Sequence, residues 1–302
     1  MSQEQPTQHR RPRLPEWFRQ KLPPGDVLAG TGRTVAASGV ATVCQSAKCP
    51  NRWQCWDGGH ATFMILGEIC TRACKFCAVC HGKPLPLDDT EPQRLADAVA
   101  ELGIRYAVIT SVTRDDLADE GAGHFVRCVE AVRQRVPGIQ VEVLPADLHA
   151  RPELIEPICA SGIVVYNHNV ETVRRLTPQV RSAADYDRSL RVFEVARQVA
   201  SRVLRKSGLI IGLGETYDEI VQAMQDLLEA GCQILTVGQY LQPGPDNLSV
   251  AKYWTPQEFD EIGREALAMG FLAVASAPLV RSSYKASLLY AQAVRRLSGD
   301  AA

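Results

Sequence analysis

Residues 61–77 read ATFMILGEICTRACKFC and place three cysteines directly after a short apolar run. The run at 61–67 has the length and the continuous apolar character of a strand that is buried on both faces. Cys70, Cys74 and Cys77 follow it with the spacing C-x3-C-x2-C. Three thiolates can bind three irons of a 4Fe–4S cluster and leave the fourth iron open to another ligand. The stretch therefore predicts a strand whose carboxyl end carries an iron–sulfur site.

Further apolar runs repeat this pattern along the chain. They lie at residues 105–112, 139–145, 162–170, 206–214 and 232–241, and amphipathic stretches at 92–103, 124–136, 185–200 and 216–231 lie between them. Apolar strands that alternate with helices indicate a parallel sheet covered on both faces. We predict an α/β fold, a partial (β/α)6 barrel of the TIM type over residues 61–255. Its functional groups are expected at the carboxyl ends of the strands.

The flanking segments are expected to form two extensions. Residues 1–60 are rich in proline and show little periodicity, so we expect an irregular N-terminal segment that folds around a metal. Residues 256–302 form the C-terminal extension, with a helix at 256–269, an apolar stretch at 271–280 and a last helix from Ser283.

Another cysteine triplet lies in the N-terminal extension. Cys44, Cys49 and Cys55 are the first triplet in chain order, and Cys70, Cys74 and Cys77 are the second. The first triplet has the spacing C-x4-C-x5-C and, like the second, no obvious fourth ligand. The two triplets together predict two metal centres, and Cys44, Cys49 and Cys55 would hold the auxiliary one.

Composition narrows the class of protein. The 302 residues carry 33 Lys and Arg against 34 Asp and Glu, so bulk charge favours neither nucleic acid nor a membrane surface as a partner. No apolar run approaches the ~20 residues of a membrane span. The first twenty residues lack the apolar core of a secretory signal. Cys128, Cys159 and Cys232 fall in apolar periodic segments and are expected to be buried thiols rather than disulfides. A cytoplasmic location fits best.

The triplet at Cys70, Cys74 and Cys77 resembles the signature of the radical S-adenosylmethionine (SAM) superfamily, including Phe76 between the last two cysteines. GLIIGLGE at 208–215 is similar to the segment that backs the adenine in that superfamily, and YNHNVET at 166–172 resembles the segment that grips the ribose. The resemblance implies a radical SAM type barrel, a 4Fe–4S cluster on the three cysteines and bound SAM, whose cleavage gives a 5′-deoxyadenosyl radical.

The same resemblance suggests which residues contact SAM. An amide and a carboxylate on one side of a strand suit a ribose diol, and Asn169 and Glu171 are two residues apart and would share a face. Arg188 would pair with the methionine carboxylate. The remaining expected cofactor contacts are Phe76, Thr110, Ser111, Gly212 and Glu215.

The first triplet is similar to the auxiliary-cluster cysteines of the lipoyl synthase family. The resemblance continues through TSVTRDDLADEGA at 110–122 and RSSYKA at 281–286. In that family a serine oxygen is the fourth ligand of the auxiliary cluster, which implies Ser283 here, with Ser282 as the second choice. A detachable alkoxide suits a cluster that is dismantled for its sulfur. The alternative is that these serines cap the last helix.

The resemblance also implies the reaction and its partners. Two sulfur atoms would enter at C6 and C8 of an octanoyl chain, and the auxiliary 4Fe–4S cluster would donate them. That chain would be linked to a lysine of a carrier, such as the glycine-cleavage H protein or a lipoyl domain of a 2-oxoacid dehydrogenase. A donor such as ferredoxin or flavodoxin would supply electrons. A basic patch at Arg202, Arg205 and Lys206 is a possible docking surface for an acidic carrier.

Several alternatives remain open on the sequence alone. Cys77 and Cys80, with His81, could form part of a zinc site. A biotin synthase-like sulfur inserter or a methylthiotransferase would also be a radical enzyme with two clusters. A non-catalytic iron–sulfur protein belongs to another class, although a barrel of this size is more than an electron carrier needs.

Overall fold

One sheet organises the computed structural model, which describes residues 14–20 and 25–299. Its strands follow one another in sequence order. Strands β2 to β8 run parallel, and β1 pairs antiparallel with β2. The strands are β1 Ala41–Thr42, β2 Thr62–Ile65, β3 Tyr106–Ser111, β4 Gln140–Leu144, β5 Val165–Asn167, β6 Leu204–Ile211, β7 Ile234–Gln239 and β8 Ala273–Ser276.

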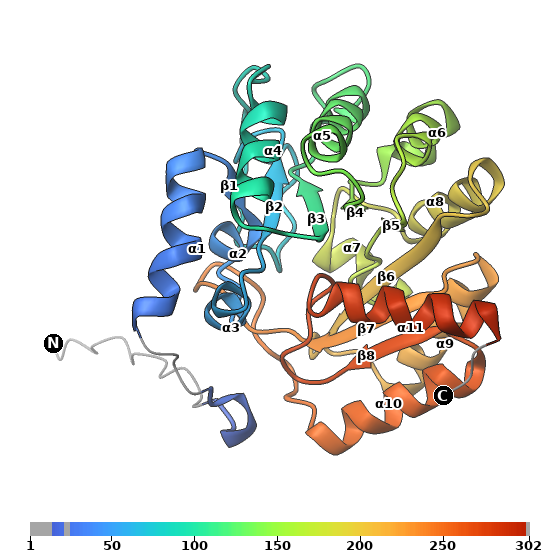
Figure 1. The fold of residues 1–302 in the computed structure, drawn as a ribbon. Coiled ribbons are helices and arrows are strands. Elements are labelled where there is room, and N and C mark those ends of the chain that lie inside the picture. The colour runs from blue at the N-terminus through green and yellow to red at the C-terminus, as the bar shows by residue number, and fades with distance from the viewer. Residues whose placement is uncertain (1–13, 21–24, 300–302) are drawn as a thin grey trace, which may run out of the picture.

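Helices cover the outer face of this sheet (Figure 1). The α-helices are α1 Gly25–Ser38, α2 Val43–Ser46, α3 Arg52–Asp57, α4 Glu91–Glu101, α5 Ala122–Arg135, α6 Pro152–Ala160, α7 Thr177–Val180, α8 Tyr186–Val199, α9 Tyr217–Glu229, α10 Pro256–Met269 and α11 Ala286–Ser298. Short 3-10 turns are η1 Glu16–Phe18, η2 Leu148–Ala150 and η3 Arg174–Leu176. Within the described ranges, no helix has both the length and the apolar character needed to cross a bilayer.

The predicted α/β barrel is confirmed, and its strands begin and end close to the apolar runs. The sheet extends further than the six expected units, because residues 271–280 contain β8, which pairs with β7. Helices α9 and α10 begin at capping boxes, in which Thr216 pairs with Glu219 and Thr255 with Glu258. These side chains bind backbone N–H groups that the first helical turn leaves free.

The core lies between the strands and the outer helices. One apolar cluster joins β2, β3 and β4 to α4, α5 and α6, with Phe63, Ile109 and Phe125 almost fully buried. A second joins β6 and β7 to α9 and α10. Apolar strand residues packed on both sides explain why the runs show no polar alternation.

Helix α11 closes the amino-terminal end of the barrel. Leu289 and Ala293 pack on the first residues of β5 to β8, and Tyr290 lies 5.8 Å from Tyr106 between ring centres. The barrel interior also contains a buried ion pair, in which Nζ of Lys206 on β6 donates to Oε1 of Glu142 on β4 over 2.8 Å. Because Lys206 and Arg205 are both buried, the basic docking patch expected at residues 202–206 is wrong.

The N-terminal segment is more regular than expected. Residues 1–13 and 21–24 lie outside the described part, but 25–38 form helix α1. Gly30 and Gly32 lower its intrinsic helix propensity and hide its period in the sequence. Tertiary contacts stabilise it instead: the hydroxyl of Thr31 donates to the carbonyl of Trp56 over 2.8 Å, and Gly32 lies close to the ring of Trp56.

Candidate active site with two cysteine triplets

A cavity of about 840 Å³ opens at the carboxyl ends of the strands. Its size is typical of a site for small molecules. It is lined by both cysteine triplets and by the two serines near the C-terminus: Cys44, Cys49, Cys55, Cys70, Cys74, Cys77, Ser282 and Ser283. The structure therefore brings together, in one space, groups that are more than two hundred residues apart in the chain.

The loop after β2 carries the second triplet. Two backbone hydrogen bonds join the ends of this loop. The N–H of Cys70 donates to the carbonyl of Cys80 over 2.8 Å, and the N–H of Gly82 donates to the carbonyl of Cys70 over 2.9 Å. Cys74 and Cys77 lie inside this closed loop and face the cavity. Cys80 is exposed and does not line the cavity, which speaks against the zinc pair of Cys77 and Cys80.

Leu66 marks the point where this loop leaves the sheet. It has a left-handed backbone with φ of 69°, unusual for a residue with a branched side chain. Its N–H donates to Oε2 of Glu91 over 2.8 Å, and its carbonyl accepts from the buried guanidinium of Arg114 over 3.2 Å. These two bonds hold the strained residue and so fix the direction of the cysteine loop.

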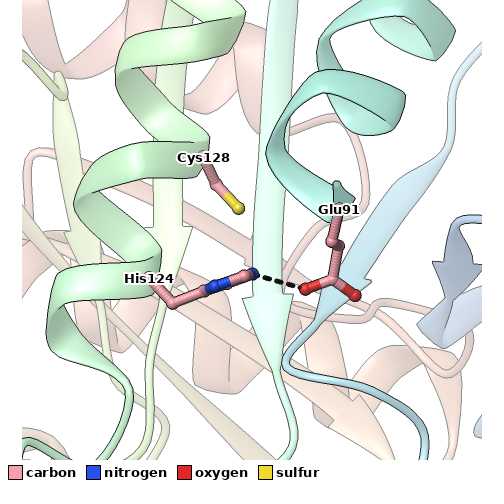
Figure 2. Close-up of side chains that lie close together, drawn as sticks. All are labelled: Glu91, His124 and Cys128. Atoms are coloured by element: carbon pink, nitrogen blue, oxygen red, sulfur yellow. Dashed lines mark hydrogen bonds and ion pairs between the residues drawn. The ribbon is translucent and has the colours of Figure 1, made fainter. Parts of the chain in front are cut away.

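Figure 2 shows the group beside Leu66, in which Glu91 from α4 meets His124 and Cys128 from α5. Nε2 of His124 lies 2.7 Å from Oε2 of Glu91, and Nη2 of Arg127 lies 3.0 Å from Nδ1 of the same ring. Because Arg127 can only donate, Nδ1 accepts and Nε2 carries the proton given to Glu91. The ring nitrogens and the carboxylate are thus engaged, and an adjacent guanidinium disfavours a cation. The group is a hydrogen-bonded support rather than a metal site.

The first triplet lies on two short helices across the cavity. Cys44 is on α2 and Cys55 on α3, while the N–H of Cys49 in the turn between them donates to the carbonyl of Cys44 over 3.1 Å. Two side chains, one at the N-cap of α3 and one within α3, contact residues that precede the last helix. The amide of Asn51 donates to the carbonyl of Leu279, and the hydroxyl of Tyr284 lies within 3.4 Å of Oε1 of Gln54.

All ten cysteines are free thiols. Burial raises the pKa of Cys55 and of Cys77 to about 12, and it raises the pKa of Cys44 and Cys74 as well. Enclosed thiols of this kind become thiolates when a metal supplies compensating positive charge, and binding then releases protons. Two sets of three free, clustered thiols at one cavity fit iron–sulfur clusters better than disulfides or inert core positions.

The segment 281–284 lines the same cavity as the two triplets. The last helix begins at Ala286, not at Ser283 as expected, and its N-cap is Lys285, which makes no side-chain cap. Neither serine therefore has the capping role that was the alternative. The hydroxyl of Ser282 accepts from the amide of Asn169 over 3.3 Å, whereas within the described ranges that of Ser283 has no hydrogen-bond partner.

Asn169 and Glu171 meet, but not on a strand. β5 ends at Asn167, and Glu171 adopts a left-handed backbone with φ of 65° that bridges to Leu209 of β6. Nδ2 of Asn169 donates to Oε1 of Glu171 over 3.0 Å. Oδ1 of Asn169 is buried and has no hydrogen-bond partner among residues 14–20 and 25–299, and both residues line the cavity. An orphaned acceptor beside a carboxylate is what a ligand with a diol would complete.

The other expected cofactor contacts divide into two groups. Phe76, Thr110 and Ser111 line the cavity. Gly212 and Glu215 do not, because the carboxylate of Glu215 accepts the N–H groups of Gly212 and Leu213 and Nε1 of Trp254. Glu215 therefore shapes the turn after β6 and supports the cavity wall from behind.

The structure does not support the contact expected for Arg188. Its Nε donates to Oδ2 of Asp147 over 2.9 Å, and it is not among the residues that line the cavity. Arg72 and Arg181 line the cavity instead. Sequence reasoning missed both, although Arg72 lies within the second triplet, where a buried cation next to three thiolates deserved consideration.

Comparisons with known proteins identify the family of the chain. The profile of the Radical SAM superfamily matches residues 64–227. The chain is 50% identical over 275 residues to the lipoyl synthase of Methylococcus capsulatus, covering 91% of this chain and 85% of that protein. It is 49% identical over 290 residues to the lipoyl synthase of Pyrobaculum calidifontis, covering 95% of this chain and 99% of that protein.

Solved structures resemble this fold at low identity. Methylornithine synthase (PylB) superimposes with a TM-score of 0.54 at 16% identity, covering 70% of this chain and 63% of that one. HydG, a maturase of the [FeFe]-hydrogenase, does so with a TM-score of 0.56 at 17% identity, covering 70% and 50%. These likenesses concern the fold alone.

Proposed function

The chain belongs to the lipoyl synthase family of the radical SAM superfamily, and from that premise we propose that it inserts two sulfur atoms at C6 and C8 of a protein-bound octanoyl-lysine. The observation that carries the proposal is the single cavity that both cysteine triplets and Ser283 line. Unactivated C–H bonds require a radical, because no side-chain base removes such hydrogens.

Each triplet would hold one 4Fe–4S cluster. Cys70, Cys74 and Cys77 would bind the cluster whose fourth iron takes SAM, and Cys44, Cys49 and Cys55 would bind the auxiliary cluster. When bound, these groups would supply the radical that breaks the C–H bonds and the sulfide that replaces the hydrogens. The task of the chain is then to hold both centres on one cavity and to exclude water.

Ser283 is our choice as the fourth ligand of the auxiliary cluster. Its hydroxyl lines the cavity and makes no other bond within the described residues, while that of Ser282 is engaged with Asn169. A hydroxyl that is already bonded is a poorer candidate for a metal ligand than a free one. Arg281 and Tyr284 position the segment, since the N–H of Tyr284 donates to the carbonyl of Arg281 over 2.9 Å.

We propose that SAM contacts residues around Asn169. The orphaned Oδ1 of Asn169 and the carboxylate of Glu171 would accept the ribose hydroxyls. Thr110 and Ser111 lie at the end of β3 and would face the methionine end. Phe76 lies within the cysteine loop and packs against the apolar cluster of β6 and β7. Arg181, which is buried at the cavity wall, replaces Arg188 as the candidate partner of the methionine carboxylate.

The partners follow from this chemistry. The octanoyl carrier would be the glycine-cleavage H protein or a lipoyl domain, and it would present its lysine to the cavity, whose lining includes the exposed residues Lys285 and Leu288. Ferredoxin or flavodoxin would reduce the cluster on Cys70, Cys74 and Cys77. Ten free thiols suit a reducing compartment.

Iron analysis and mass spectrometry on anaerobically purified protein test the proposal together. Two 4Fe–4S clusters require about eight irons and eight sulfides per chain. With an octanoylated carrier peptide, SAM and dithionite, we expect a product that has gained two sulfurs. Its dithiol form keeps the hydrogen count of the substrate, and its disulfide form has two hydrogens fewer. About four irons per chain, or a peptide of unchanged mass, would contradict the proposal.

A further inference from the structure

Arg72 lies in the loop between Cys70 and Cys74, and its guanidinium binds two carboxylates at once. Nη1 and Nη2 donate to the two oxygens of Asp147, each over 2.9 Å. Nε and Nη2 donate to the two oxygens of Asp115 over 2.9 and 2.7 Å. The side chain of Arg72 is only 6% exposed. Two bidentate pairs on one buried guanidinium fix its plane and its position.

The carboxylates come from different strand ends. Asp115 follows β3 and Asp147 follows β4, so Arg72 ties the cysteine loop to both. Asp147 is fully buried and also accepts from Nε of Arg188 over 2.9 Å. We call the four residues Arg72, Asp115, Asp147 and Arg188 the charge clamp. It contains two cations and two anions and is therefore neutral.

The backbone next to Asp147 is strained. Leu148, His149 and Ala150 have positive φ angles of 44°, 47° and 51°, although none is glycine. Oδ1 of Asp147 accepts from the N–H of His149 over 3.3 Å and helps to hold this turn. Strain of this kind persists only where surrounding contacts over-determine the conformation, and it clusters at functional sites.

The clamp also sets the surroundings of the Cys70 sulfur. The N–H of Arg72 donates to Sγ of Cys70 over 3.4 Å, and that of Thr113 donates to the same sulfur over 3.3 Å. Thr71 bonds Thr113 through its own N–H over 3.1 Å. Hydrogen bonds to cluster sulfurs and nearby buried charge are the means by which proteins tune the potential of an iron–sulfur cluster.

We infer that the charge clamp positions the loop of Cys70, Cys74 and Cys77 and sets the reduction potential of the cluster that this loop would hold. The inference rests on the proposed function, because it requires a cluster on these three cysteines. Arg72 and Asp147 are positioning residues: they act through the cysteines and not on the substrate. A buried ion pair is weak evidence for a role in stability alone, which favours a functional reason for its presence.

Variants that leave net charges of opposite sign in the clamp can show whether it sets the reduction potential of the cluster or only holds the cysteine loop in place. Asp147→Asn leaves two guanidiniums with one carboxylate, so the added positive charge should stabilise the reduced cluster and shift its potential upward. Arg72→Gln leaves two carboxylates with one guanidinium and should shift the potential downward. Arg72→Lys keeps the charge but cannot form both bidentate pairs, so it should keep a potential near that of the parent while cleaving SAM more slowly.

The test is a potentiometric titration, followed by electron paramagnetic resonance, of the full-length protein with both clusters. We expect opposite shifts in Asp147→Asn and Arg72→Gln, with the auxiliary cluster unchanged as the internal reference. Asp97→Asn, which removes an exposed partner of Arg135, is the matched control and should change neither cluster.

Shifts of the same sign in both variants, or no shift in variants with full iron content, would overturn the inference. Where these two variants lose the cluster altogether, Asp115→Asn decides, because Asp115 is the more exposed carboxylate of the clamp. We expect a smaller upward shift there, and an unchanged potential would overturn the inference. A parent protein without a cluster on Cys70, Cys74 and Cys77 would instead contradict the proposed function.

Discussion

The side-chain amide of Asn169 donates to the hydroxyl of Ser282 over 3.3 Å. Asn169 follows β5 in the barrel, and Ser282 precedes the last helix. The bond joins the part of the cavity proposed for SAM to the segment proposed for the auxiliary cluster. The two halves of the site are thus in direct contact through the chain itself, as a substrate that must react with both centres requires.

The two neighbouring serines should differ when each is replaced. In Ser283→Ala the auxiliary cluster loses its proposed oxygen ligand, so we expect lipoyl product to fall by at least ten-fold while SAM cleavage persists. Ser282→Ala removes one hydrogen bond, worth about 1 kcal/mol, and should retain most of the product. Product yield and 5′-deoxyadenosine are measured side by side. The reverse order of the two variants would assign the ligand to Ser282.

The two cysteine triplets should separate the two halves of the reaction. Cys49→Ser should still cleave SAM but form no lipoyl product, and Cys74→Ser should abolish both. Cys80→Ser is the matched control, since this thiol is exposed and lies outside the cavity lining, and it should retain both activities. Chromatography of 5′-deoxyadenosine and mass spectrometry of the peptide give the two readouts. Lipoyl formation by Cys49→Ser at the parent rate would refute the donor role of the first triplet.

Gly238 of β7 lets the C-terminal segment approach the sheet. A β-carbon at this position would collide with the carbonyl oxygen of Val280, so Gly238→Ala must displace the chain just before Ser282. Overpacking of this kind costs about 1–3 kcal/mol. We expect a lower midpoint of unfolding and less lipoyl product per SAM cleaved.

Gly30→Ala is the control for Gly238→Ala, because Gly30 lies within helix α1 and a β-carbon there would meet no other described part of the chain. Alanine is a better helix former than glycine, so this variant should match or slightly exceed the stability of the parent. Equal product yields from Gly238→Ala and Gly30→Ala would show that the close approach is unimportant for the site.

His168 should make the fold sensitive to acid. Burial, together with the charge of Arg181, lowers the pKa of His168 to about 4 from an unfolded value of 6.5. The unfolded chain therefore binds a proton first as the pH falls. The stability contributed by the neutral ring is full above pH 6.5 and is lost as the pH falls toward 4, by about 3 kcal/mol in all.

His168→Gln has no such proton to bind. The free energy of unfolding should fall less steeply for this variant than for the parent between pH 6.5 and 4, as measured by denaturant titration at several pH values. Parallel curves for the two proteins would show that another group dominates the acid response.

The sequence was informative where a pattern is local. Continuous apolar runs predicted β2 to β7 because a strand covered on both faces needs no polar alternation. The cysteine spacings predicted both triplets because ligands of one cluster lie on one short loop. Helix α1 was not predicted, because Gly30 and Gly32 interrupt the helical repeat of apolar residues and lower the helix propensity. Contacts with Trp56, which are not visible in the local sequence, stabilise it.

Long-range pairs could not be predicted in the same way. Arg72 and Asp147 meet because adjacent parallel strands place their carboxyl ends together, and nothing in either local sequence identifies the partner. The positive charge of Arg188 suggested a contact with the methionine carboxylate of SAM. In the structure its guanidinium is instead bound to Asp147. Glu171 reaches Asn169 through a left-handed turn, a conformation that glutamate rarely adopts.

The central claim is that the centre on Cys44, Cys49 and Cys55 supplies the sulfur. The most direct measurement is a single turnover with protein whose clusters were reconstituted with heavy-isotope sulfide, in buffer containing only the ordinary isotope. We predict two heavy sulfurs in the lipoyl product and the loss of one cluster per chain. The lost cluster is assigned to the first triplet if Cys49→Ser, treated in the same way, forms no product and loses no cluster. Product that contains ordinary sulfur, with both clusters intact, would contradict the account.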